Sequence, residues 1–115
     1  MISKLYLTYI TTNIRKTVLY TGFTNNLAAR LCEHYRDRKA KTTFAGKYNC
    51  FYLVYYDVFF APGQGIGREK EIKGWSREKK ETLINKYNPE WRFLNDEFLD
   101  WPPTDDVDYR RLRHW

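Results

Sequence analysis

The chain has little of what disulfide, zinc or histidine-based catalytic sites are built from. Its 115 residues include two cysteines, two histidines and one methionine. Cys32 and Cys50 stand alone, with no CxxC pair and no cluster of histidines. We therefore expect two free thiols rather than a disulfide or a zinc site. A Ser-His-Asp hydrolase is also excluded, because His114 is the penultimate residue and no serine lies in a GxSxG turn.

Long apolar runs are missing as well. No run reaches the roughly 18 residues that a membrane span requires, and residues 1–4 lead into a strand-like run without the apolar region of a signal peptide. We expect no membrane partner and a cytoplasmic location.

Glycine is sparse, and three of the six glycines lie where phosphate-binding loops occur, between a strand and a helix. Gly63, Gly65 and Gly67 form a GxGxG spacing. This spacing lacks both the GxGxxG pattern of dinucleotide-binding loops and the GK[ST] of triphosphate-binding loops. We interpret these glycines as a loosened helix start rather than as a nucleotide site.

Aromatic residues and positive charge are abundant. Aromatics make up 18% of the chain, and ten of them are tyrosines. Tyrosine suits partly solvated surfaces, because its ring can be buried while its hydroxyl keeps a hydrogen-bond partner. Residues 1–95 contain 17 Lys or Arg and 8 Asp or Glu, whereas residues 96–115 contain 3 and 6. This length fits one domain, so we expect a basic domain over 1–95 and an acidic, aromatic tail over 96–115. A basic surface favours a polyanionic partner such as nucleic acid.

The hydrophobic patterns predict a small α+β domain. Strand-like runs rich in tyrosine and β-branched residues cover 5–12, 17–24 and 51–60, and the first two read as a hairpin. Three helices are predicted: one from a cap at Thr24 or Asn25 to near Arg38, one from Pro62 to about Trp75, and one from Ser76 to about Tyr87. Residues 37–48 form a basic loop.

Four side chains near the N-terminus suggest phosphodiester chemistry. Tyr9 and Tyr20 come from the two hairpin strands, and Arg30 and His34 are one turn apart on the helix that follows. Taken singly, each has a structural explanation: cross-strand packing for the tyrosines and a solvated helix face for Arg30. Later in the chain, Glu69 lies among lysines, where a surface ion pair would explain it.

Taken together, these residues resemble the GIY-YIG nuclease domain. Tyr9 is followed eleven residues later by Tyr20-Thr21-Gly22, and then by Arg30, His34 and Glu69. The runs 19–24, 68–77 and 86–91 extend the similarity over roughly 4–95 and resemble small single-domain bacterial members related to the nuclease end of excision-repair incision proteins. The Gly-Ile of the first motif is Leu7-Thr8 here, and the Ile of the second is Thr21. The resemblance implies a three-stranded antiparallel sheet flanked by three helices.

The resemblance also implies roles for the site residues. Tyr9 and Tyr20 correspond to the two namesake tyrosines, one of which activates or orients the attacking water. Arg30 corresponds to the arginine that steadies charge on the phosphate, and His34 to a supporting or proton-handling position. Glu69 corresponds to the single carboxylate ligand of Mg²⁺ or Mn²⁺, and one carboxylate suffices when phosphate and water supply the other ligands. Because the pKa of tyrosine is about 10, a tyrosine base needs a metal or a cation beside it.

One element of the family pattern is displaced. Many relatives carry a late asparagine near the proline that ends the last helix, and the corresponding position here is Trp91 or Arg92. Asn85, Asn88 and Asn95 lie nearby at other offsets, and the sequence leaves open which of them, if any, takes its place.

The expected function is therefore that of a metal-dependent endonuclease, catalysing hydrolysis of DNA phosphodiester bonds in DNA repair or processing. DNA is favoured over RNA, a protein partner for targeting is compatible with the small size, and the oligomeric state stays open. An unpaired base could stack on Tyr48, Phe51 or Trp75. Backbone phosphates would be held by the cations Lys39, Lys41, Lys47, Arg68, Lys70, Lys73, Arg77, Lys79 and Lys80. The alternatives are a non-catalytic nucleic-acid-binding module on the same fold and a protein-interaction adaptor acting through the tail.

Overall fold

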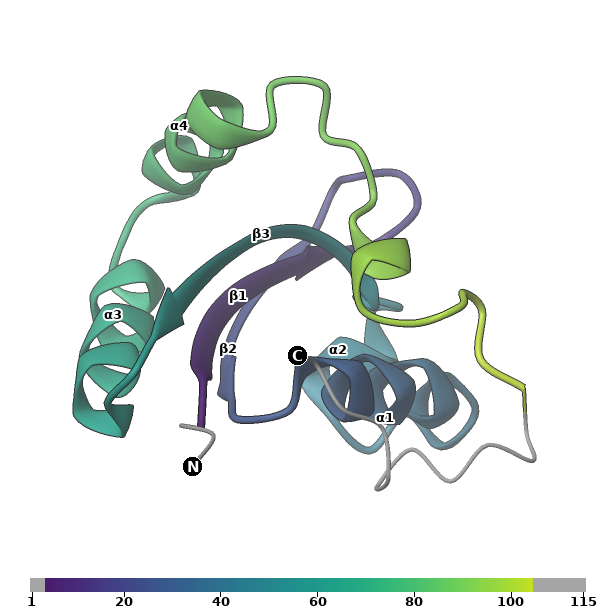
Figure 1. Cartoon of the computed structure of the whole chain (residues 1–115). Coiled ribbons are helices and arrows are strands. Elements are labelled where there is room, and N and C mark those ends of the chain that lie inside the picture. The colour runs from purple at the N-terminus through teal and green to yellow at the C-terminus, as the bar shows by residue number, and fades with distance from the viewer. Residues whose placement is uncertain (1–3, 105–115) are drawn as a thin grey trace.

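A three-stranded antiparallel sheet forms the centre of the fold (Figure 1). The computed structural model describes residues 4–104. The strands are β1 (Tyr6–Thr12), β2 (Leu19–Thr24) and β3 (Tyr52–Phe59), in the order β2-β1-β3. The expected α+β class and three-stranded antiparallel sheet are confirmed, and each strand lies within the range predicted from its pattern. Because β1 is central, β2 and β3 are the two edge strands.

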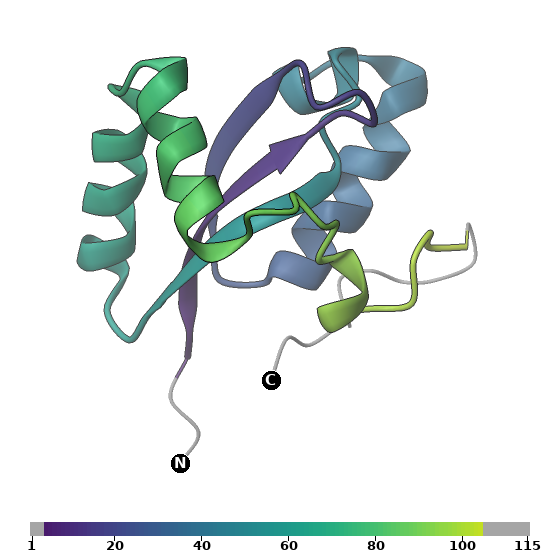
Figure 2. The ribbon, with the colours of Figure 1, turned by 90° about the horizontal axis from the view of Figure 1, so that it is seen from above.

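Helices cover both faces of the sheet. On one face lie α1 (Leu27–Ala40) and α2 (Phe44–Lys47), and on the other lie α3 (Pro62–Lys73) and α4 (Arg77–Tyr87) (Figures 1 and 2). The sequence predicted three of these four helices. The fourth, α2, is a single turn inside the stretch expected to be a basic loop, and a short 3-10 helix, η1 (Asn95–Glu97), follows α4.

The caps of the helices explain two boundaries. Ser76 caps α4 as predicted, because its hydroxyl accepts a hydrogen bond from the Lys79 amide. The α1 cap is Asn26 rather than Thr24 or Asn25, because the Asn26 side chain accepts from the Ala29 amide at 3.1 Å. Thr24 instead accepts from the Asn26 amide at 3.0 Å and so fixes the turn between β2 and α1.

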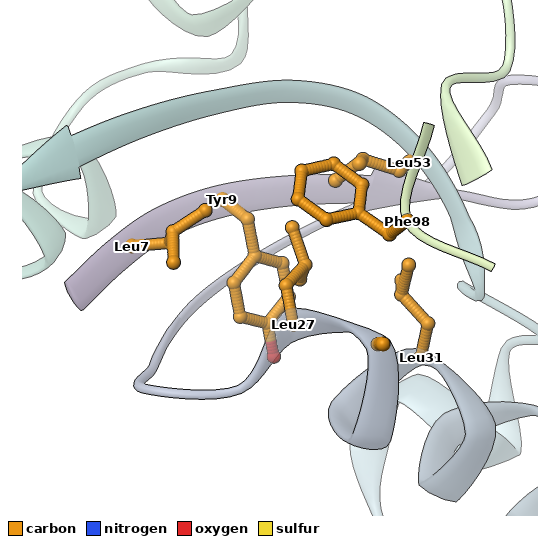
Figure 3. Packing of buried hydrophobic residues seen from close by; sticks show 7 residues of the cluster. Leu7, Tyr9, Leu27, Leu31, Leu53 and Phe98 are labelled. Carbon is orange, nitrogen blue, oxygen red and sulfur yellow. The ribbon is translucent and has the colours of Figure 1, made fainter. Parts of the chain in front are cut away.

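Alternation along β1 builds two separate cores. Leu7 and Tyr9 face α1 and pack with Leu27, Leu31 and neighbouring apolar residues (Figure 3). Ile10 faces the other way and packs in the cluster that contains Ile72 of α3. A residue of β1 or β2 therefore belongs to either the α1 side or the α3 side of the sheet, and this assignment decides which candidate site residues can meet.

The chain after α4 covers the outer edge of β3. The Leu94 amide donates to the Leu53 carbonyl at 2.8 Å, and Asn95 bonds the Leu53 amide and the Phe51 carbonyl, both at 2.8 Å. Phe98 then enters the core on the α1 side. Packing against the core thus continues past residue 95. The predicted boundary between a domain over 1–95 and a tail over 96–115 stays a prediction. Tail residues 105–115, which include His114, lie outside the described residues. Over residues 4–104, no helix is long and apolar enough to cross a membrane.

Candidate active site

Three of the predicted site residues form one cluster on the α1 side of the sheet. The Tyr9 hydroxyl and Nε2 of His34 share a buried hydrogen bond of 2.8 Å. The Tyr20 ring lies edge-on to the His34 ring at 5.3 Å between centroids and 6.2 Å from the Tyr9 ring. Tyr9 reaches the cluster from the core, with its hydroxyl directed toward α1 (Figure 3). The hairpin and α1 thus bring together groups that are 25 residues apart in sequence.

Gly22 makes room for this cluster. It lies directly opposite Tyr9 in the β1–β2 register. A Cβ atom at Gly22 would lie 2.3 Å from the Tyr9 hydroxyl oxygen and 2.4 Å from the ring carbon that carries it. Only a residue without a side chain leaves space for the phenol, so the glycine of the second motif has a steric reason.

Burial keeps the Tyr9–His34 pair neutral. Burial is the main cause that lowers the pKa of His34 to about 4, and the positive charge of Arg30 lowers it further. Burial and the neighbouring Tyr20 phenol raise the pKa of Tyr9 well above its usual range. At neutral pH the pair is therefore an uncharged imidazole and an un-ionised phenol. This argues against Tyr9 as the group that removes a proton from water.

The lowered pKa of His34 predicts that acid destabilises the fold. An unfolded histidine binds a proton below about pH 6.5, whereas His34 in the folded chain binds one only near pH 4. The contribution of His34 to the free energy of unfolding is therefore fully present above pH 6.5. It is lost between pH 6.5 and 4, and the loss is about 3 kcal/mol in total. Urea unfolding at a series of pH values measures this loss.

A His34→Gln variant is the control for that measurement, since it keeps a polar side chain but does not titrate. Its free energy of unfolding should change much less between pH 6.5 and 4. Hydrogen bonds from Thr42 and Thr43 lower the pKa of Asp37 to about 2. The stabilising contribution of Asp37 is therefore lost only at more acidic pH, as the pH falls below the usual pKa of an aspartate. An equal slope for both proteins would contradict the neutral state of His34.

Arg30 lies beside this cluster at the surface. Its side chain is 42% exposed and has Glu33 within 3.5 Å. Such an exposed pair on one helix is worth little, so the guanidinium can exchange Glu33 for a phosphate. The charge of Arg30 adds to the burial that lowers the pKa of His34, and it partly offsets the burial that raises the pKa of Tyr9. Arg30 is therefore a cation that adjoins the cluster on the α1 side of the sheet.

Asp37 organises the connection from α1 to α2, a role that the sequence did not reveal. Its carboxylate accepts hydrogen bonds from the hydroxyls of Thr42 and Thr43, both at 2.5 Å, and from the Thr43 amide at 2.9 Å. Thr43 caps α2 through the Gly46 amide at 3.1 Å. A Cβ at Gly46 would collide with the Asp37 carboxylate. The single turn of α2 is therefore held in one place beside the site.

Close packing of α3 against the hairpin corrects our interpretation of its glycines. Gly65 is buried, and a Cβ there would lie 2.5 Å from the Phe23 ring of β2. The Thr8 hydroxyl donates to the Gly65 carbonyl at 2.7 Å. Gly65 thus tightens the contact between α3 and the sheet instead of loosening the start of the helix. Gly63 and Gly67 face open space.

Glu69 follows Gly65 by one turn, on the α3 side of the sheet. Residues one turn apart share a helix face, so Glu69 lies along the side of α3 that approaches β2. Its neighbour Arg68 points instead toward β3, where it pairs with Asp57 at 3.1 Å. The Glu69 side chain is 20% exposed and has Lys73 at 3.5 Å.

The sheet therefore separates Glu69 from the tyrosine cluster. Tyr9, Tyr20 and His34 lie on the α1 face, with Arg30 beside them on α1, and Glu69 lies on the α3 face. The two faces adjoin at β2, whose outer edge is covered by no other strand within residues 4–104. This edge is therefore one place at which the two groups of residues are accessible from the same side.

The donors near Glu69 fit a hard cation such as Mg²⁺ or Mn²⁺. Glu69 supplies one carboxylate oxygen donor, and residues 4–104 contain no group of three or more His, Cys, Asp or Glu side chains that could hold a metal without help. Thr21, two residues before Phe23, faces α3 as well, and its buried hydroxyl has no hydrogen-bond partner among the described residues. A single carboxylate, with an unpartnered hydroxyl on the same side of the sheet, suits an ion that keeps water and phosphate ligands.

The three asparagines considered as substitutes for the late family asparagine are engaged elsewhere. Asn88 donates to the carbonyls of Val54 and Arg92 at 3.0 and 2.9 Å. Asn85 accepts from the Trp91 indole at 2.6 Å, and Asn95 bonds the backbone of β3. Asn88 also lines a cavity of about 410 Å³ beside β3, together with Tyr55, Tyr56 and Tyr87. None of the predicted catalytic residues lines that cavity.

The predicted phosphate-binding cations fall on both sides of the sheet. Lys39, Lys41 and Lys47 are exposed near α2, and Lys70, Lys73 and Lys79 are exposed on α3 and α4. Two arginines in the predicted set are largely engaged: Arg68 by Asp57 and Glu71, and Arg77 by Glu81 and the carbonyls of Lys16 and Thr17. Burial and the like charges of Lys73 and Arg77 lower the pKa of Lys80. Cys32 and Cys50 are free, as predicted, and both are buried.

Comparison with known proteins identifies the family of the chain. Residues 5–88 match the family model described as the GIY-YIG catalytic domain. A UPF0213 protein of Staphylococcus haemolyticus is 37% identical over 68 residues, which cover 59% of this chain and 80% of that protein. A UPF0213 protein of Staphylococcus aureus is 35% identical over the same share of both chains. No solved structure gives a significant match. Since the family model covers most of the chain, this protein belongs to the GIY-YIG catalytic domain family.

Proposed function

We propose that this protein is a metal-dependent endonuclease that hydrolyses DNA phosphodiester bonds at the β2 edge. Membership of the family implies a nuclease-like function on a nucleic acid. The observation that carries the finer proposal is the hydrogen-bonded Tyr9–His34 pair with Tyr20 and Arg30 beside it, on the strand whose other face adjoins the helix of Glu69. This arrangement offers groups for phosphate, water and a metal around one edge.

Each residue has a distinct part in the proposed reaction. Arg30 binds the phosphate through two parallel N–H donors and stabilises the charge of the pentacovalent transition state. Tyr20, which is less buried than Tyr9, orients the attacking water. Tyr9 and the neutral His34 hold the Tyr20 ring in place. Glu69 would hold Mg²⁺ or Mn²⁺, and such an ion would supply charge stabilisation at the leaving oxygen.

The lysines of both faces would track the backbone of the substrate. Lys39, Lys41 and Lys47 lie on the α2 side, and Lys70, Lys73 and Lys79 on the α3 and α4 side, so a strand crossing the β2 edge would meet both groups. Binding through such cations weakens as salt rises, because bound counterions are released. A role in DNA repair or processing, a targeting partner and a cytoplasmic location remain part of this proposal.

Cleavage of labelled DNA tests the proposed function. We expect products from nicked, branched or single-stranded DNA in the presence of Mg²⁺ or Mn²⁺, and none after EDTA removes the metal. DNA and RNA versions of one substrate distinguish the two nucleic acids. Salt-sensitive binding of all these substrates without any cleavage would refute the proposal and favour the non-catalytic binding module.

A further inference from the structure

Exposed aromatic rings continue the tyrosine cluster to the surface. The Phe44 ring of α2 stacks on Tyr20 with 6.0 Å between centroids and an interplanar angle of 25°. Tyr48 packs against Phe44 at 4.7 Å. Phe44 is 50% exposed and Tyr48 is 40% exposed. We call Tyr20, Phe44 and Tyr48 the aromatic platform; it begins at a candidate catalytic residue and ends in solvent.

The platform is held by the structure around it. Asp37 fixes both threonines before α2, and Thr43 caps the helix. On the inner side of α2, Ala45 and Gly46 are buried. The backbone that carries Phe44 is therefore fixed from both sides, while the Phe44 ring is left half in solvent. A rigid, exposed aromatic surface requires no ordering when a ligand binds, and so favours binding.

Positive charge borders the aromatic platform. The Lys47 ammonium lies 5.4 Å from the centre of the Tyr48 ring. Lys39 and Lys41 are exposed on the chain that leads into α2, and within residues 4–104 no carboxylate forms an ion pair with any of these three lysines. Protein interfaces are depleted in lysine. Aromatic rings beside free cations instead match surfaces that bind single-stranded nucleic acid.

We propose that the aromatic platform stacks an unpaired base next to the phosphate bound at the candidate active site. The substrate class is then a single strand, or a segment with unpaired bases, because the bases of an intact duplex already stack on one another and cannot reach the rings. Stacking tolerates any base, so the site would select for strandedness rather than for sequence. The position of the phosphate rests on the proposed function, whereas base stacking itself does not require cleavage.

The residues of the aromatic platform differ from the three stacking residues predicted from the sequence. Phe51 is buried in the core. Trp75 already has Arg68 and Lys79 over its ring. Only Tyr48 of the three predicted residues belongs to the aromatic platform. Phe44 was not predicted, because residues 37–48 were expected to be a loop and Phe44 begins α2 instead.

Binding measured without metal tests this inference separately from catalysis. Fluorescence anisotropy in EDTA would compare a labelled single strand with the matched duplex, each as DNA and as RNA. Phe44→Ala should weaken single-strand binding about tenfold, which is ~1.4 kcal/mol, and leave duplex binding unchanged. Phe44→Trp should restore it. The DNA and RNA arms show which strand the aromatic platform prefers, and either preference supports the inference.

Phe60→Ala is the matched control, because Phe60 is 74% exposed after β3 and removing it should change neither affinity. If Phe44→Ala does not fold, Phe44→Leu keeps an apolar side chain without the aromatic ring and should show the same selective loss. Equal weakening of strand and duplex, or no weakening in a folded variant, overturns the inference. A protein that binds single strands through Phe44 but never cuts them would refute the nuclease function alone.

Discussion

Glu69→Gln is expected to lower the rate of cleavage by about a thousandfold with little change in stability. The variant keeps the shape of the side chain but removes the charge that would hold the metal. Loss of several kcal/mol of transition-state stabilisation corresponds to this factor, at about 1.4 kcal/mol per tenfold. The ion pair with Lys73 is a contact within one helix at 3.5 Å, and such surface pairs contribute about 0–1 kcal/mol. Single-turnover cleavage and urea unfolding measure the two effects.

Glu71→Gln is the matched control for this experiment. Glu71 lies two residues further along α3, is 54% exposed and pairs with Arg68. The same chemical change there should leave cleavage within about twofold of wild type, since surface changes away from special sites are worth about 0.5 kcal/mol or less. If Glu69→Gln and the wild type cut at equal rates, the role given to Glu69 is wrong.

Gly22→Ala should destabilise the hairpin strongly for the addition of a single methyl group. The new Cβ would lie 2.3 Å from the Tyr9 hydroxyl oxygen, inside contact distance, and β1 and β2 are tied together by their ladder. Overpacking of this kind costs about 1–3 kcal/mol. Because Tyr9 must move away from His34 to relieve the overlap, cleavage should also fall. Urea unfolding measures the stability and single-turnover cleavage measures the rate.

The same substitution at Gly67 should raise the free energy of unfolding instead of lowering it. An added Cβ at Gly67 meets nothing within 4 Å, and Gly67 lies inside α3. Alanine in a helix interior is more stable than glycine by roughly 0.5–1 kcal/mol. If Gly22→Ala were as well tolerated as Gly67→Ala, the close contact between Gly22 and Tyr9 would not be a constraint on the fold.

The strands and the three long helices could be predicted because each follows from local patterns. Alternating and β-branched residues mark the strands, and Pro62 and Ser76 mark helix starts. The turn of α2 could not be predicted in this way. It depends on Asp37, whose carboxylate accepts hydrogen bonds from the Thr42 and Thr43 hydroxyls, and no repeating sequence pattern marks such side-chain contacts.

Part of the site was accessible from sequence and part was not. The spacing of Tyr9, Tyr20, Arg30 and His34 predicted a cluster, and the structure brings the two tyrosines and His34 into contact. How near Glu69 lies to β2 depends on how closely α3 packs on the sheet, and the contact of Gly65 with Phe23 sets that distance. A pattern of single residues does not encode such a contact between distant segments.

We propose one active site, formed around the β2 edge by residues from both faces of the sheet. Paramagnetic broadening by Mn²⁺ in the nuclear magnetic resonance spectrum tests this claim most directly, because the effect falls steeply with distance from the ion. We expect Mn²⁺ to broaden the amide signals of Glu69 and also those of Tyr20 and Gly22 across the edge, and the broadening to disappear in Glu69→Gln. Broadening that spares Tyr20 and Gly22, or that persists unchanged in Glu69→Gln, would contradict a shared site.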